Sequence, residues 1–198
     1  MIWLTNWQIF CVSESIVLVA TGWNHNVNKY KDYCQVIDLN SRKSCANLPP
    51  YPVSMHYGGG GVLNDTPVIC GGYSYSKYAY ESACYYHNKI TNVWMLLGNL
   101  NKARSEFGFA PLDGGFWVTG GHAPSLTTTT EIIHLNGTIS MGTPLPTARA
   151  GHCMVTLSKD EILIIGGYPP SNNKKTIFYN KYSKIYTNGP TLNYDRYK

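Results

Sequence analysis

Short apolar runs alternate with polar, glycine-containing stretches along the whole chain. Residues 162–165, Ile-Leu-Ile-Ile, form one such run, which is followed at once by Gly166 and Gly167. A run of this length that is rich in Ile favours a β-strand and is too short for a helix. Two adjacent glycines allow a positive φ, or a close backbone approach that a Cβ atom would block. Because no segment has the spacing of an amphipathic helix, the pattern predicts an all-β protein.

A glycine pair after a strand also occurs in phosphate-binding loops, and those loops continue into a helix. Here the pair is followed by Tyr168-Pro169-Pro170, which breaks a helix instead of starting one. The local sequence therefore excludes a nucleotide-binding loop.

The combination of apolar run and glycine occurs four times. The second glycines of the four copies are Gly22, Gly72, Gly121 and Gly167, and successive ones are 50, 49 and 46 residues apart. The first glycines are Gly71, Gly120 and Gly166, whereas the first copy has Thr21 instead. A steady period of this size indicates repeated structural units.

Other positions keep the same register. A later strand is predicted in each unit, at residues 34–38, 83–87, 130–134 and 176–180. Six or seven positions further on stand four apolar residues expected to fill the space between sheets: Cys45, Trp94, Met141 and Tyr186. The units are joined by a Leu-x-x-x-Arg segment at 100–104, 145–149 and 192–196, and 48–54 is a longer version without the arginine. We expect Arg104 and Arg149 to open the first strand of the next unit.

With its period near 50 and its double glycine, the chain resembles the Kelch repeat of β-propellers from about Trp7 onward. The resemblance implies one domain over residues 1–198, in which each repeat forms a four-stranded antiparallel blade. Kelch rings usually have six or seven blades, and 192–196 resembles the start of a further one. We therefore expect an incomplete ring, truncated at both ends, in preference to a closed ring of four blades.

The glycine pairs are expected to be structural. Replacing Gly167 by Val should cost about 2–4 kcal/mol, because a side chain there meets a forbidden φ or a packed backbone. Gly137→Ala, in a turn where other units carry Ser41 or Lys89, is expected to be nearly harmless.

The six cysteines allow two disulfides. Cys34 and Cys45, and likewise Cys70 and Cys84, are predicted on adjacent antiparallel strands, where a bridge forms if the register is right. The alternative is that all six cysteines are small buried apolar residues. Cys11 and Cys153 are left over and are expected to be free thiols.

Two Asn-x-Thr triplets place possible glycosylation sites at Asn64 and Asn136, in predicted turns. Together with two disulfides they favour an extracellular or secretory location slightly. The first ten residues argue the other way, since they lack the basic segment and cleavage site of a signal peptide.

The net charge of +5 comes without a run of Lys and Arg, which disfavours nucleic acid as the partner. No stretch of about twenty apolar residues predicts a membrane span. The six histidines have no Cys or carboxylate neighbours at metal-ligand spacing, and no G-x-S-x-G motif is present. We therefore expect no metal, no cofactor and no catalysis. His87 and His134 are expected to serve strand turns.

The resemblance implies a protein-binding module that uses the loops at the blade ends, at 24–31, 73–80, 122–129 and 168–175. Tyrosine suits such surfaces because it gives rigid contact area at low entropic cost. The candidate partner-binding residues are Tyr73, Tyr75, His122, Tyr168, Arg104 and Arg149. The two arginines are candidates because they could bind a partner's carboxylate, or alternatively the carbonyls of a neighbouring blade. Other Kelch-type roles are a ubiquitin-ligase adaptor, a secreted adhesion or carbohydrate-binding propeller, and an oxidase similar to galactose oxidase.

Overall fold

The computed structural model describes residues 8–11, 16–24, 29–41, 43–44, 48–112 and 114–196. The described chain is all-β, apart from one 3-10 turn, η1 (Pro170–Asn172). Its strands form four four-stranded antiparallel sheets and a separate two-stranded hairpin. This confirms the prediction of an all-β protein with one four-stranded antiparallel sheet in each unit.

Each sheet is built from consecutive parts of the chain. Sheet 1 contains β1 (Gln8–Cys11), β2 (Ile16–Asn24), β3 (Lys29–Asp38) and β4 (Lys43–Ser44). Sheet 2 contains β5 (Gly59–Leu63), β6 (Thr66–Cys70), β9 (Ala83–Asn88) and β10 (Val93–Asn99). Sheet 3 contains β11 (Gly108–Leu112), β12 (Gly115–Thr119), β13 (Thr130–His134) and β14 (Ile139–Met141). Sheet 4 contains β15 (Cys153–Thr156), β16 (Glu161–Ile165), β17 (Thr176–Asn180) and β18 (Ile185–Asn188).

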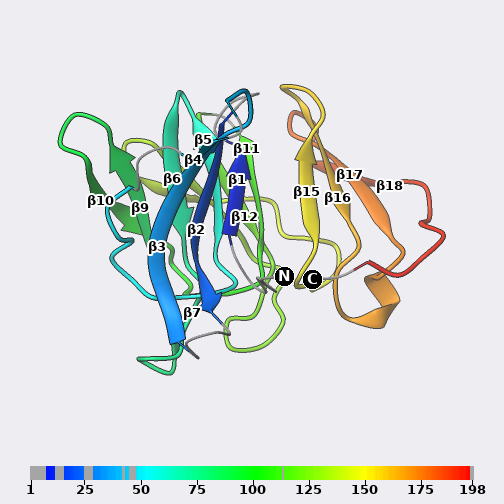
Figure 1. Cartoon of the computed structure of the whole chain (residues 1–198). Coiled ribbons are helices and arrows are strands. Elements are labelled where there is room, and N and C mark those ends of the chain that lie inside the picture. The colour runs from blue at the N-terminus through cyan, green and yellow to red at the C-terminus, as the bar shows by residue number, and fades with distance from the viewer. Residues whose placement is uncertain are drawn as a thin grey trace.

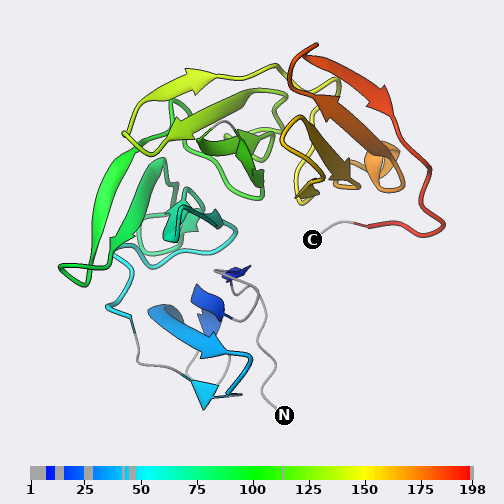
Figure 2. The same cartoon turned by 90° about the horizontal axis from the view of Figure 1, so that it is seen from above.

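The four sheets follow one another in chain order along an open arc (Figure 2). The first strands of successive sheets are in contact, β1 with β5, β5 with β11, and β11 with β15. Between the first and second sheet the buried cluster includes Tyr51, Ile69 and Trp94. Trp94 donates from Nε1 to the carbonyl of Pro49 at 3.0 Å and lies edge-on to Tyr51. Two further clusters join sheets 2 and 3 and sheets 3 and 4, so the apolar faces are buried between neighbouring sheets.

The glycine pairs end the second strands of sheets 2, 3 and 4, and all six glycines have positive φ: Gly71, Gly72, Gly120, Gly121, Gly166 and Gly167. The second glycine of each pair donates its N–H to a linker carbonyl at 2.8 Å: Gly72 to Arg104, Gly121 to Arg149, and Gly167 to Arg196. This bond is why the glycines and the Leu-x-x-x-Arg segments keep one register along the sequence. The conformational requirement predicted for the glycines is confirmed.

Several local expectations were wrong. Arg104 and Arg149 precede β11 and β15 and lie in the linkers, not in strands. Gly137 has φ +85°, and a Cβ there would meet the carbonyl oxygen of Leu97, so Gly137→Ala is not harmless. Met141 is 62% exposed and does not fill the space between sheets. The whole of 24–31 was expected to be a loop, but β2 extends to Asn24 and β3 begins at Lys29.

The turns between the last two strands are closed by Asp or Asn side chains that accept backbone N–H groups two residues on. Asp38, Asn88, Asn136 and Asn180 have this role. His87 and His134 serve these turns in another way, as expected. The ring of His87 lies 3.1 Å from Oδ1 of Asn92 in the β9–β10 turn, and the carbonyl of His134 accepts the N–H of Gly137 at 2.9 Å in the β13–β14 turn.

In the part of the chain that the structure describes, no helix has the length and apolar character required to cross a membrane.

Candidate functional site

A hairpin extends from the glycine end of sheet 2. It consists of β7 (Tyr73–Ser74) and β8 (Ala79–Tyr80), which follow Gly72 directly, and it lies at the bottom of Figure 1. The turn between its strands contains Tyr78, which has φ +51° and is 79% exposed. An ion pair of 2.8 Å between Lys77 and Glu81 spans the hairpin. The loop predicted at 73–80 is therefore an ordered projection that carries tyrosines.

Five aromatic rings gather around this hairpin, two from the linker that precedes sheet 2 and three from the hairpin itself: His56, Tyr57, Tyr73, Tyr75 and Tyr80. His56 and Tyr75 stack with centroids 4.6 Å apart and planes at 23°. Edge-on contacts connect Tyr73 to Tyr75 at 5.1 Å and to Tyr80 at 5.2 Å. We call these five residues the aromatic cluster. Edge-to-face and stacked pairs of this kind stabilise the arrangement beyond the area that they bury.

His56 is the buried centre of the aromatic cluster, at 3% exposure, whereas Tyr75 is 42% exposed. The backbones of His56 and Tyr73 exchange two hydrogen bonds, of 3.1 and 2.8 Å, which fix the linker to the hairpin. Burial lowers the pKa of His56 to about 4, and a backbone hydrogen bond at Tyr73 opposes the shift. The imidazole is therefore uncharged at neutral pH, so His56 adds no charge to the aromatic cluster.

Three of the expected binding residues occupy equivalent places in successive sheets. Tyr73, His122 and Tyr168 each follow a glycine pair and each form an isolated bridge to the preceding linker. Tyr168 is 47% exposed, and His122 is half-buried. Ring contacts place Tyr73 in the aromatic cluster, and among the described residues none extends to His122 or Tyr168. The structure thus brings Tyr73 and Tyr75 together and leaves the other two apart from them.

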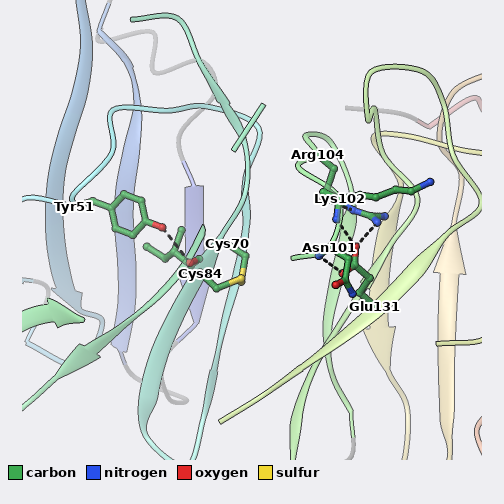
Figure 3. Close-up of a disulfide and its surroundings, with 8 residues drawn as sticks. Tyr51, Cys70, Cys84, Asn101, Lys102, Arg104 and Glu131 are labelled. Carbon is green, nitrogen blue, oxygen red and sulfur yellow. Dashed lines mark hydrogen bonds and ion pairs between the residues drawn. A yellow bond between two sulfur atoms is a disulfide. The ribbon is translucent and has the colours of Figure 1, made fainter. Parts of the chain in front are cut away.

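The other two expected binding residues, Arg104 and Arg149, are 0% and 1% exposed, which disagrees with a role at a partner-binding surface. Arg104 donates to the carbonyls of Gly120 and Thr129, both at 2.9 Å, and its Nη2 lies 2.6 Å from Oε1 of Glu131. Glu131 also accepts the backbone N–H groups of Asn101 and Lys102 (Figure 3). The guanidinium thus joins the linker to sheet 3, which agrees with the alternative structural role.

The predicted Cys70–Cys84 disulfide is present, on the paired strands β6 and β9 (Figure 3). Both cysteines are fully buried in the cluster between sheets 2 and 3. For the second predicted pair, Cys34 is buried, and Cys45 lies outside the described residues. Cys153 is an exposed free thiol, as expected. The side chain of Cys11 is outside the described part of the chain.

Asn64 and Asn136 are both exposed, in the β5–β6 and β13–β14 turns. Oδ1 of Asn136 accepts from the backbone N–H and the hydroxyl of Thr138, at 3.0 and 2.7 Å. Both amides are accessible for modification, and glycosylation stays a prediction.

The part of the aromatic cluster that the sequence did not predict is His56 and Tyr57. They stand in 48–57, the linker in which Met55 takes the place of the arginine. The signal that could have found them is the His-Tyr pair directly before the glycines at 58–61. Among the described residues, no group of three or more His, Cys, Asp or Glu side chains could hold a metal ion.

No protein-family model matches this chain, and no curated protein matches it.

Proposed function

We propose that this chain is part of a Kelch-type β-propeller that binds a partner protein through the aromatic cluster. The fold component of the proposal is supported by the four equivalent sheets in an arc and by the glycine-to-linker bond that recurs in sheets 2, 3 and 4. A sheet of four short strands buries its faces only by stacking on neighbours, as propeller blades do. The incomplete ring remains part of this proposal.

The observation that carries the binding proposal is the exposure of Tyr75 and Tyr78 on a hairpin whose first strand is hydrogen-bonded to the linker at His56. Tyr75 stacks on buried His56, so its ring is oriented before a partner arrives. Tyr78 lies in the same turn of the hairpin and is 79% exposed. Preorganised aromatic rings lose little entropy on binding and are the common anchors of protein interfaces.

The experiment compares cross-linked partners of three forms of the protein: the wild type, a Tyr75→Ser/Tyr78→Ser variant and an Ile90→Ser variant. Ile90 is 96% exposed in the β9–β10 turn, at the other end of sheet 2 from the hairpin (Figure 1). We expect a partner that the wild type and Ile90→Ser retain equally and that the double tyrosine variant loses. A partner retained equally by all three would rule out the hairpin as the binding surface.

A secreted form of the same module is the second candidate, and the Cys70–Cys84 disulfide favours it because structural disulfides persist in oxidising compartments. The exposed turns at Asn64 and Asn136 are compatible with glycans. Export of the chain from cells behind a secretory leader, followed by glycosidase treatment, tests this. We expect glycosidase to lower the mass of the secreted wild type. The loss of mass should be smaller in Asn64→Gln and in Asn136→Gln. A secreted product whose mass the glycosidase leaves unchanged would contradict use of the triplets.

A further inference from the structure

Arg149 and Arg104 are equivalent residues in two successive linkers. The carbonyl of each accepts the N–H of the glycine that ends the preceding pair. The guanidinium of each donates to the carbonyl of the first glycine of the following sheet, Gly120 for Arg104 and Gly166 for Arg149. The hydrogen-bond partners of Arg104 therefore indicate which chemical groups the side chain of Arg149 can bind.

The hydrogen bonding of the two arginines differs sharply. Arg104 donates from Nε to the carbonyl of Lys102 and from Nη1 to two further carbonyls. Its Nη2 donates to the hydroxyl of Thr129 and the carboxylate of Glu131. Arg149 donates to the carbonyl of Gly166 at 3.1 Å and to the hydroxyl of Thr147 at 3.2 Å. Its Nε is buried and has no hydrogen-bond partner among the residues that the structure describes.

The difference has a simple origin in the sequence. The strands β13 and β17 begin at Thr130 and Thr176, so Ile177 stands where sheet 3 has Glu131. Within the described residues, no acidic side chain forms an ion pair with Arg149. A guanidinium stays protonated in proteins, so Arg149 is a buried cation that lacks the carboxylate its equivalent has.

A hollow of about 360 Å³ opens beside this cation. Its lining includes Arg149, Lys175, Thr147, Ile177 and Tyr186. Of the described residues that line it, two are cations and none is acidic. Burial raises the pKa of Tyr186, so its phenol stays protonated and cannot act as the missing anion. That hydroxyl donates to the carbonyl of Thr143 at 2.8 Å instead.

We propose that this hollow binds a small carboxylate ligand of the dicarboxylate class. One carboxylate accepts from the guanidinium of Arg149 from within the hollow, beside Ile177, and so supplies the negative charge that Glu131 supplies to Arg104. The second carboxylate lies near the ammonium of Lys175. Carboxylates match the planar fork of Arg, and charge-assisted hydrogen bonds to it are the strong ones. The volume admits a molecule of four or five carbons, and the two cations favour two negative charges.

The test is calorimetric titration of the folded protein with succinate, acetate and sulfate at constant ionic strength. We expect succinate to bind more tightly than acetate and sulfate. Ile177→Glu should abolish succinate binding, because it supplies the carboxylate internally. Lys175→Ser, at an exposed position, should weaken succinate binding by up to about fivefold and leave acetate binding unchanged.

Several results would overturn the proposal: no succinate binding to the wild type, equal affinities for sulfate and succinate, or wild-type affinity in folded Ile177→Glu. If Ile177→Glu does not fold, the Lys175→Ser arm decides, and an unchanged preference for succinate over acetate counts against a dicarboxylate. A further ligand is glutamate with its amino and α-carboxyl groups blocked. If it binds and succinate does not, the hollow binds an acidic side chain of a polypeptide instead.

Discussion

Arg104 and Glu131 form an ion pair of 2.6 Å in which both side chains are fully buried, although 27 residues separate them in the chain. The same carboxylate accepts two backbone N–H groups of the linker. The pair therefore connects the linker after sheet 2 to the third strand of sheet 3. Removal of either side chain of the pair leaves the other as an uncompensated charge in the interior.

Glu131→Ala should lower the free energy of unfolding by about 3–5 kcal/mol, because the guanidinium of Arg104 then stays buried without a counter-ion. Urea denaturation at neutral pH measures the loss. The control is Lys174→Ala, which breaks the 4.0 Å ion pair to Asp195, whose two side chains are 50% and 59% exposed, and should cost under about 1 kcal/mol. Similar losses in the two variants would show that the buried pair contributes no more than a surface pair.

The stability of the protein should depend on pH through His56. Its pKa is about 4 in the folded state against 6.5 for the unperturbed group, so the unfolded chain binds the proton more tightly. The stability that the neutral ring contributes is fully present above pH 6.5 and is lost as the pH falls from 6.5 towards 4.

The measurement is the urea midpoint between pH 7 and pH 4.5, and the control is His56→Phe, which keeps a ring in the aromatic cluster but cannot titrate. We expect the midpoint of the wild type to fall more steeply with pH than that of the variant. Parallel curves would mean that His56 keeps an ordinary pKa in the folded protein.

Gly167→Ala should cost about 2–4 kcal/mol, because it combines a strained backbone with a close approach. Gly167 has φ +101°, and a Cβ there would lie 2.9 Å from the carbonyl oxygen of Ala150. Gly114→Ala is the matched control, since Gly114 has φ +71° and, its chain neighbours aside, no described residue comes within 4 Å of the added carbon. It should cost only about 1 kcal/mol. Thermal midpoints compare the two variants. Equal shifts of the two midpoints would show that the positive φ alone, and not the contact with Ala150, makes a glycine necessary at position 167.

Removal of the Cys70–Cys84 bridge should destabilise the protein by about 2–3 kcal/mol, because the bridge closes a loop of 14 residues and restricts the unfolded chain. The double variant Cys70→Ala/Cys84→Ala is compared with the wild type, with and without reducing agent. Reducing agent should lower the urea midpoint of the wild type only. A thiol titration that finds both cysteines free in the untreated wild type would contradict the bridge.

The sequence by itself determined the strands and the units of this protein. Apolar runs, glycine pairs and Leu-x-x-x-Arg segments recur with one period because the N–H of the second glycine binds the arginine carbonyl in sheets 2, 3 and 4. The Cys70–Cys84 bridge was predictable for the same reason, since two strands at known spacing in one sheet are neighbours. These are relations within one unit or between adjacent segments, and local pattern encodes them.

The tertiary structure decided where side chains from different units meet. The sequence left two roles open for Arg104 and Arg149, binding of a partner's carboxylate or of a neighbouring blade's carbonyls. Both are buried, and each guanidinium donates to a glycine carbonyl of the following sheet, which agrees with the second role. Only one of the two has a carboxylate, since β13 carries Glu131 where β17 carries Ile177. The aromatic cluster likewise joins His56 from a linker to the hairpin at 73–80. Burial and pairing of this kind depend on how neighbouring sheets pack, and the period of a repeat does not specify which side chain faces which across that packing.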